Sequence, residues 1–131
     1  MQTKVIRQTA TFPAKPSEVY ELLMDSRKHA SFSGAKANIS RKVGGKFTAY
    51  DGYCEGTNLE LIENKKIVQS WRGKDWPEGH YSTLSYTLSP VKTGTRLSFY
   101  QSGVPVKNYV HIKQGWIDHY WQPMKKKLAA K

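Results

Sequence analysis

Histidine is the residue type in this sequence best suited to general acid–base chemistry or metal binding. Four histidines occur: His29 in a predicted short helix, His80 in a loop, and His111 and His119 on a long C-terminal helix. His111 and His119 do not share a helical face well. No cysteine or carboxylate stands at a spacing that would complete a zinc site. The pattern predicts exposed histidines on helix surfaces and no bound metal.

A hydrolytic site would need a nucleophile, a base and an orienting acid that converge in space. Glu55 and Glu60 fall on opposite faces of a predicted strand and cannot act as a pair. Cys54 is the only cysteine, so no disulfide forms within the chain. A free structural thiol in a reducing compartment is the natural interpretation. The sequence therefore predicts no catalytic residues and no cofactor.

The tryptophans in "SWRGKDWPEGHYSTL", residues 70–84, raise a separate question, because connecting loops normally avoid large apolar rings. Trp71 is in phase with Ile67 on a predicted strand and is expected to be buried. Trp76 lies beyond the strand, beside Pro77. It is expected either to close over a cavity mouth or to stand exposed as a partner anchor, since tryptophan dominates interface hot spots. Both alternatives stay open.

The formal charge of +11, from 21 basic and 10 acidic residues, favours acidic partners. The basic residues are spread along the chain. Their one cluster, residues 125–127, suits the negative end of a helix dipole. No nucleic-acid-binding motif occurs, which disfavours nucleic acid as a partner. No apolar run reaches the length of a membrane span or a signal peptide, so a cytoplasmic location is expected.

At 131 residues the chain is expected to form one domain, residues 1–131. Alternating residues predict a strand over residues 4–12. Pro16 is placed to open a helix, and Ser26 to cap a second, short helix. From residue 38 to residue 102, short alternating runs divided by turn signals predict an antiparallel meander with one buried face. Its inward residues are expected to be Leu59, Leu61, Leu84, Tyr86, Leu88, Leu97 and Phe99.

Residues 106–128 predict one long amphipathic helix. Pro123 is expected to kink it, and Gly115 to let it approach another element closely. Its apolar stripe is expected to be formed by Val110, Ile117, Trp121, Met124 and Leu128. The stripe is expected to be wide, because Ile112, Trp116 and Tyr120 lie beside it.

The element order defines the fold class as α+β. A strand, two short helices, several strands and a long helix follow one another, as in the helix-grip fold. A curved antiparallel sheet must cover its apolar face, and only the C-terminal helix is long enough to do so.

Several motifs together resemble a known family: "GGKF" (44–47), "WR" (71–72), "WPEGHYSTL" (76–84), "GVP" (103–105) and "GWIDHYWQPMKKKL" (115–128). They resemble the C-terminal domain of the activators of heat-shock-protein ATPase, within the START-like (SRPBCC) superfamily. The resemblance covers nearly the whole chain and implies a stress-associated co-chaperone of the ninety-kilodalton heat-shock chaperone. Such co-chaperones also carry an N-terminal domain whose asparagine- and tryptophan-rich motif is absent here. A standalone homologue or a fragment with a binding role is therefore expected.

Two main functions remain open, and a cavity enzyme of cyclase or hydrolase type is a further alternative. The first is non-enzymatic binding of a heat-shock chaperone or another acidic protein, with candidate contacts Lys36, Arg41, Lys42, Lys46 and Trp76. The second is carriage of a small hydrophobic ligand between sheet and helix. Its candidate walls, which could equally fill the interior, are Phe47, Leu59, Leu84, Tyr86, Phe99, Trp116, Tyr120 and Met124.

Overall fold

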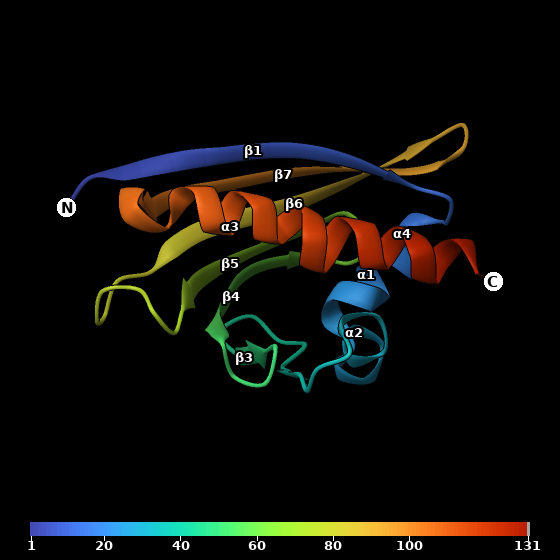
Figure 1. The fold of residues 1–131 in the computed structure, drawn as a ribbon. Coiled ribbons are helices and arrows are strands. Elements are labelled where there is room, and N and C mark those ends of the chain that lie inside the picture. Colours follow the sequence, from blue (N-terminus) through green and yellow to red (C-terminus); the bar gives the residue numbers. More distant parts are fainter. Residues whose placement is uncertain (131) are drawn as a thin grey trace.

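A computed structural model describes residues 1–130. One sheet holds all the strands, in the order β1-β7-β6-β5-β4-β3-β2, and each neighbouring pair is antiparallel. The sheet curves around the C-terminal helix (Figure 1). In chain order the elements are β1 Thr3–Phe12, α1 Pro16–Met24, α2 Ser26–Ser33, β2 Asn38–Ile39, β3 Lys46–Ala49, β4 Cys54–Ile62, β5 Lys66–Gly73, β6 Ser82–Val91, β7 Gly94–Pro105, a 3₁₀ turn Val106–Asn108, α3 Tyr109–Trp116, a π-helical turn Ile117–Trp121 and α4 Gln122–Ala129.

The two short helices follow β1 as expected, with Pro16 in the first turn of α1. The predicted N-cap of α2 is wrong. Asp25 caps the helix, and its carboxylate accepts a hydrogen bond from the backbone N–H of Lys28. The hydroxyl of Ser26 instead accepts a 2.8 Å hydrogen bond from the N–H of Ile39, which attaches α2 to β2.

Strand β4 departs from the alternation expected of its leucines. Leu59, predicted to face the interior, is 48% exposed, whereas Asn58 is 0% exposed. The reason is that Cys54 and Gly56 face the interior at the start of β4, which sets the phase for Asn58. A register shift against β5 then falls between Asn58 and Glu60. The prediction for Leu59 is therefore wrong, both as a core residue and as a wall of an interior cavity.

The C-terminal helix is present, and most of its predicted apolar residues are buried; of the predicted stripe, Val110 is exposed and Ile117 is half-buried. Val110 is 77% exposed, whereas Ile112, two residues further along, is buried. Pro123, the predicted site of a kink, follows an irregular turn. Ahead of it the helix widens into the π turn, in which the N–H of Gln122 donates to the carbonyl of Ile117. The buried residues of this helix are Ile112, Trp116, Tyr120, Trp121, Met124 and Leu128.

Candidate functional site

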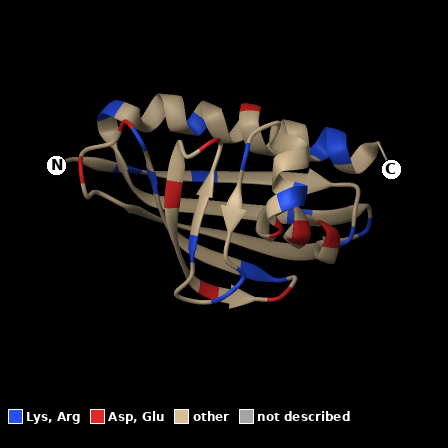
Figure 2. Cartoon of the chain, turned by 90° about the horizontal axis from the view of Figure 1, so that it is seen from below, with Lys and Arg blue, Asp and Glu red and all other residues tan. Residues whose placement is uncertain are grey.

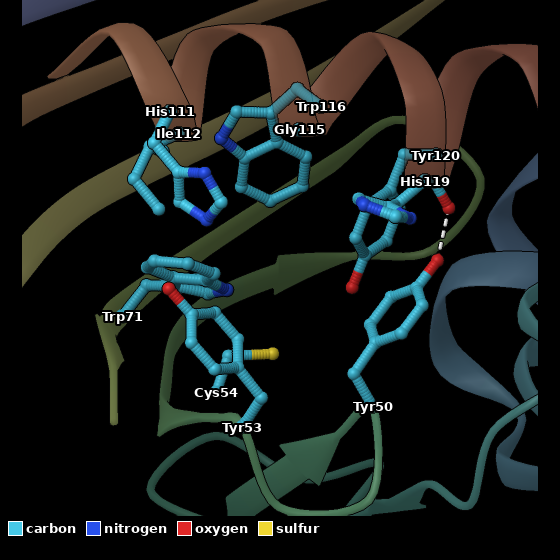
Figure 3. Close-up of a pocket in the computed structure, with 10 residues that line it drawn as sticks. All are labelled: Tyr50, Tyr53, Cys54, Trp71, His111, Ile112, Gly115, Trp116, His119 and Tyr120. Carbon is cyan, nitrogen blue, oxygen red and sulfur yellow. Dashed lines mark hydrogen bonds between the residues drawn. The ribbon is translucent and has the colours of Figure 1, made fainter. Parts of the chain in front are cut away.

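A half-open pocket of about 250 Å³ lies between the C-terminal helix, β5 and the turn that joins β3 to β4. Figure 3 shows the helix residues on one side and Tyr50, Tyr53 and Trp71 opposite them. The pocket is lined by Tyr50, Tyr53, Cys54, Trp71, His111, Ile112, Gly115, Trp116, His119 and Tyr120.

The β3–β4 turn that forms one wall has an unusual backbone. Tyr50 (φ 53°) and Asp51 (φ 57°) both adopt the left-handed conformation, which costs free energy for residues other than glycine. Interactions with neighbours hold the turn in place. Asp51 exchanges hydrogen bonds with the backbone of Lys36. The Tyr50 hydroxyl donates to the carbonyl of His119 (Figure 3). In a regular α-helix this carbonyl would accept a hydrogen bond from the backbone N–H of residue 123. Residue 123 is a proline and has no N–H, so the carbonyl is available to Tyr50.

A buried polar chain positions the tryptophan walls. The indole N–H of Trp116 donates to the Gln101 side chain at 2.8 Å. The Gln101 amide donates to the hydroxyl of Ser82, which donates to the carbonyl of Trp71. These bonds tie the helix to β7, β6 and β5, and they orient Trp116 with its ring centroid 5.5 Å from that of Trp71. Trp71 is buried, as its phase predicted.

The Tyr50 and Tyr53 phenols and the Cys54 thiol in the pocket wall remain uncharged at neutral pH. Burial raises the pKa of the Tyr50 phenol well above its usual value. Burial, and then the hydrogen bond to Asp75, do the same to the pKa of Tyr53. Burial also raises the pKa of the Cys54 thiol to about 12. Because the reactive form of cysteine is the thiolate, Cys54 is a poor nucleophile here.

The histidines are placed differently from expectation. His29 is buried rather than exposed, because α2 turns it inward onto the C-terminal helix. Its Nε2 lies 3.0 Å from the Tyr120 hydroxyl. Burial lowers the pKa of His29 to about 4. His80 is half-buried and hydrogen-bonds the carbonyl of Gly103.

His111 and His119 are exposed, but the expectation that they lie on separate faces is wrong. Both line the same pocket, on either side of Gly115. The π turn that begins at residue 117 alters the regular rotation of the helix between them. Among residues 1–130, no group of three histidine, cysteine or acidic residues is arranged to hold a metal ion.

The predicted ligand-cavity walls lie in four different settings. Trp116 and Tyr120 line the pocket. Phe47, Tyr86 and Tyr120 border a void of only about 10 Å³, too small for a ligand. Leu59 faces outward, and the remaining three are buried in the core: Leu84, Phe99 and Met124.

Sequence reasoning missed the tyrosine turn and the histidine pair as pocket walls. The signals were present: a glycine in mid-helix flanked by histidines four residues away on each side, and tyrosines around a "DG" turn.

The predicted partner-binding residues are surface groups, with one exception. Lys36, Arg41, Lys42 and Lys46 are exposed. Trp76 is 4% exposed, and its ring lies 5.3 Å from that of Trp71. The loop folds back, which makes Trp76 a packed lid on Trp71 and not an exposed anchor. In Figure 2 the Lys and Arg segments lie on helices, strands and loops across the molecule, with fewer acidic segments among them.

The fold has clear counterparts among solved structures. An HSP90 activator from Plasmodium falciparum matches with a TM-score of 0.87 and 26% identity, over 95% of this chain and 96% of that one. The Aha1 dimer from Colwellia psychrerythraea matches with a TM-score of 0.81 and 20% identity, over 95% of this chain and 96% of that chain, which shows a shared fold. The curved sheet, the long helix and these counterparts define a START-like, helix-grip domain.

The sequence comparisons narrow this class to one family. The model of the family described as Activator of Hsp90 ATPase homolog 1-like protein matches residues 13–129. The human activator of 90 kDa heat shock protein ATPase homolog 1 is 33% identical over 88% of this chain. An uncharacterized protein from Schizosaccharomyces pombe is 33% identical over 95% of it. The chain belongs to the Activator of Hsp90 ATPase homolog 1-like family.

This chain corresponds to one part of those relatives. It spans 34% of the human protein and 37% of the fission-yeast protein. None of the helices formed by residues 1–130 is long and apolar enough to cross a membrane.

Proposed function

We propose that this domain binds a heat-shock chaperone of the ninety-kilodalton class through an acidic surface of that partner, without a catalytic step of its own. Membership of the activator family supports a chaperone-associated role, and the net charge of +11 favours an acidic partner. Stimulation of the chaperone's ATPase would be an effect on the partner's active site.

One surface carries this proposal: the loop between β2 and β3, which we call the basic loop, residues 41–46. Val43 is 62% exposed on this loop, and Leu59 is exposed on the neighbouring strand. Lys42 and Lys46 form no ion pair with any of residues 1–130. Exposed aliphatic groups beside free lysines suit a partner segment that carries both apolar and acidic side chains.

The basic loop is held rigidly by Asn58 beneath it. The Asn58 side chain donates to the carbonyls of Ser40 at 2.7 Å and Lys42 at 3.1 Å. Its backbone also exchanges hydrogen bonds with Gly44 and Gly45. A further hydrogen bond, from the N–H of Gly45 to the carbonyl of Lys42, closes the turn that carries Val43. A surface that is already ordered loses less conformational entropy on binding, which favours affinity.

The other candidate residues have smaller roles in this proposal. Arg41 is bound by the Glu21 carboxylate through two hydrogen bonds, of 2.6 and 3.2 Å. A partner would therefore have to compete for its charge. Lys36 lies beyond the opposite end of β2. Its backbone bonds to Asp51, so it belongs to a separate part of the surface.

The test is an amide NMR titration with the source organism's own ninety-kilodalton chaperone, at low and moderate salt. We expect shifts at residues 41–46 and at Leu59 that shrink as salt screens the charges. The double substitution Lys42→Glu and Lys46→Glu should weaken binding at least tenfold.

The control carries the same charge change elsewhere: Lys92→Glu with Lys107→Glu, at two exposed positions in other turns. Equal weakening by both pairs would mean that net charge alone drives association. No shifts in the wild-type protein would reject the chaperone as partner.

A further inference from the structure

The half-open pocket is a feature that partner binding through the basic loop does not use. We propose that it binds a small planar aromatic molecule carrying an acidic group, with the ring between Trp71 and Trp116 and the acid at the mouth beside His111 and His119. This inference goes beyond the proposed function. It concerns other residues, so either can fail without the other.

The size of the pocket is the first support. Its volume of about 250 Å³ equals the share of roughly eight water molecules in the liquid, and a cavity of about 150 Å³ already binds benzene. A molecule of one or two fused rings therefore fits. By contrast, the sheet-facing interior beneath Tyr86 leaves only about 10 Å³, which makes the pocket the larger of these two spaces.

The walls determine what the inner part of a ligand must be. Several polar groups of the pocket wall already have a partner in the protein. The Tyr53 hydroxyl donates to Asp75 at 2.8 Å, and the Cys54 thiol lies 3.7 Å from the carbonyl of Ala49. The Tyr50 hydroxyl and the Trp116 N–H are also engaged. A polar group placed there would lose its hydration without compensation. Aromatic rings would instead stack on or meet the edges of rings.

The mouth offers the opposite chemistry. His111 and His119 are exposed, and neither ring makes a hydrogen bond with any of residues 1–130. An imidazole donates a hydrogen bond to a carboxylate in either its neutral or its charged form. The net charge of +11 also favours an anion over a cation. The acidic group of the ligand would remain partly hydrated there, which avoids the cost of burying a charge.

Gly115 is the residue that keeps the pocket open. A Cβ atom at this position would meet only the His119 ring, at 3.8 Å, which is an ordinary contact. Close packing therefore does not require this glycine, contrary to the expectation from the sequence. Glycine inside a helix costs about 1 kcal/mol relative to alanine. The space that it leaves is part of the pocket.

Two irregular backbone segments also border the pocket. The left-handed turn at Tyr50 and Asp51 forms one side, and the π turn Ile117–Trp121 contributes His119 and Tyr120 on the other. Both kinds of segment cost free energy relative to regular structure and cluster at functional sites. The hydrogen bond between Tyr50 and His119 joins them.

The experiment uses naphthalene-2-carboxylate as the probe, titrated into labelled protein and followed by NMR. We expect saturable shifts of the Trp71 and Trp116 indole N–H signals and of the Gly115 amide. Gly115→Leu should fill the pocket and weaken binding at least tenfold. Gln114→Leu adds a leucine to the adjacent exposed position and should leave binding unchanged. Linear, unsaturated shifts in the wild-type protein, or unchanged affinity in Gly115→Leu, would overturn the proposal.

The acidic group is tested separately with the neutral analogue naphthalene-2-carboxamide. We expect the carboxylate to bind several-fold more tightly than the amide. Replacing both mouth histidines, by His111→Ala with His119→Ala, removes their N–H donors and should abolish this preference while retaining amide binding. Equal affinity of the two probes for the wild-type protein would overturn the assignment of the acid to the mouth. Each variant's thermal unfolding midpoint shows whether it is folded.

Discussion

Between β6–β7 and the C-terminal helix, Phe99 and Met124 are sealed in the core, whereas near the β3–β4 turn the same helix faces an open pocket. Both regions lie between one sheet and one helix, and both are rich in aromatic residues. They differ in their backbones. Regular paired strands bring side chains into close packing in the first region. In the second region, Gly115 supplies no side chain, and the pocket separates the Tyr50–Asp51 turn from the helix. Composition alone therefore does not decide whether an aromatic cluster fills its space.

The largest expected effect is a cavity in the packed region. Phe99→Ala should lower the free energy of unfolding by about 3–5 kcal/mol, because tightly packed neighbours cannot collapse into the space. Its ring centroid lies 4.4 Å from that of Trp116 and 5.3 Å from that of Trp121. Denaturant unfolding measures the change. The control is Tyr100→Ala, on the outer face of the same strand, with a cost of about 1 kcal/mol or less. Similar costs for the two would mean that the region is not tightly packed.

The second effect concerns His29, at the boundary between the two regions. Its pKa in the folded protein is about 4, against 6.5 when exposed. The unfolded chain therefore binds more protons between these values. Stability should be fully present above about pH 6.5 and fall as pH drops toward 4, by at most about 3 kcal/mol.

The measurement for His29 is the free energy of unfolding from pH 7 to pH 4, for the wild type and for His29→Gln. Subtraction of the two curves removes the contribution of the carboxylates. The difference should shrink as pH falls. Parallel curves would show that His29 titrates normally and is not buried.

A smaller effect is expected at the link between the strained turn and the π turn. Tyr50→Phe removes the hydroxyl that donates to the His119 carbonyl and should cost about 1 kcal/mol. Pro123→Ala restores a backbone N–H that can donate a hydrogen bond to this carbonyl. In that background, Tyr50→Phe should therefore lower the free energy of unfolding by less. A double-mutant cycle measures the difference. Strict additivity of the two substitutions would contradict the role assigned to Pro123.

The smallest effect has the opposite sign. Gly115→Ala should stabilise the protein by about 0.5–1 kcal/mol, because alanine favours the helix and its methyl group enters free space. The comparison is Gly56→Ala, where the added Cβ would lie 1.8 Å from the carbonyl oxygen of Ser70 and must destabilise. Thermal unfolding of both variants is the measurement. Destabilisation by Gly115→Ala would show that the pocket is closed in solution.

Much of the fold follows from local pattern. Period-two alternation located β1, β6 and β7 correctly, because their apolar residues share one face throughout. The same reasoning failed at Leu59, where a bulge changes the phase. The prediction that Val110 is buried also failed, because this helix has more apolar residues than its sheet-facing side can bury. For the pocket, Trp116 and Tyr120 were predicted, while its mouth and turn depended on contacts between segments far apart in the chain.

By itself, the sequence determined the fold class and the strongly basic charge, because alternation, turn residues and composition act locally or sum over the whole chain. The family followed from the resemblance of its motifs. Only the tertiary structure decided that Trp76 packs on Trp71, that Asn58 supports the basic loop, and that a pocket remains beside Gly115. Each of these features depends on hydrogen bonds or steric contacts between elements that are far apart in the sequence. Those contacts form only when the sheet packs around the helix.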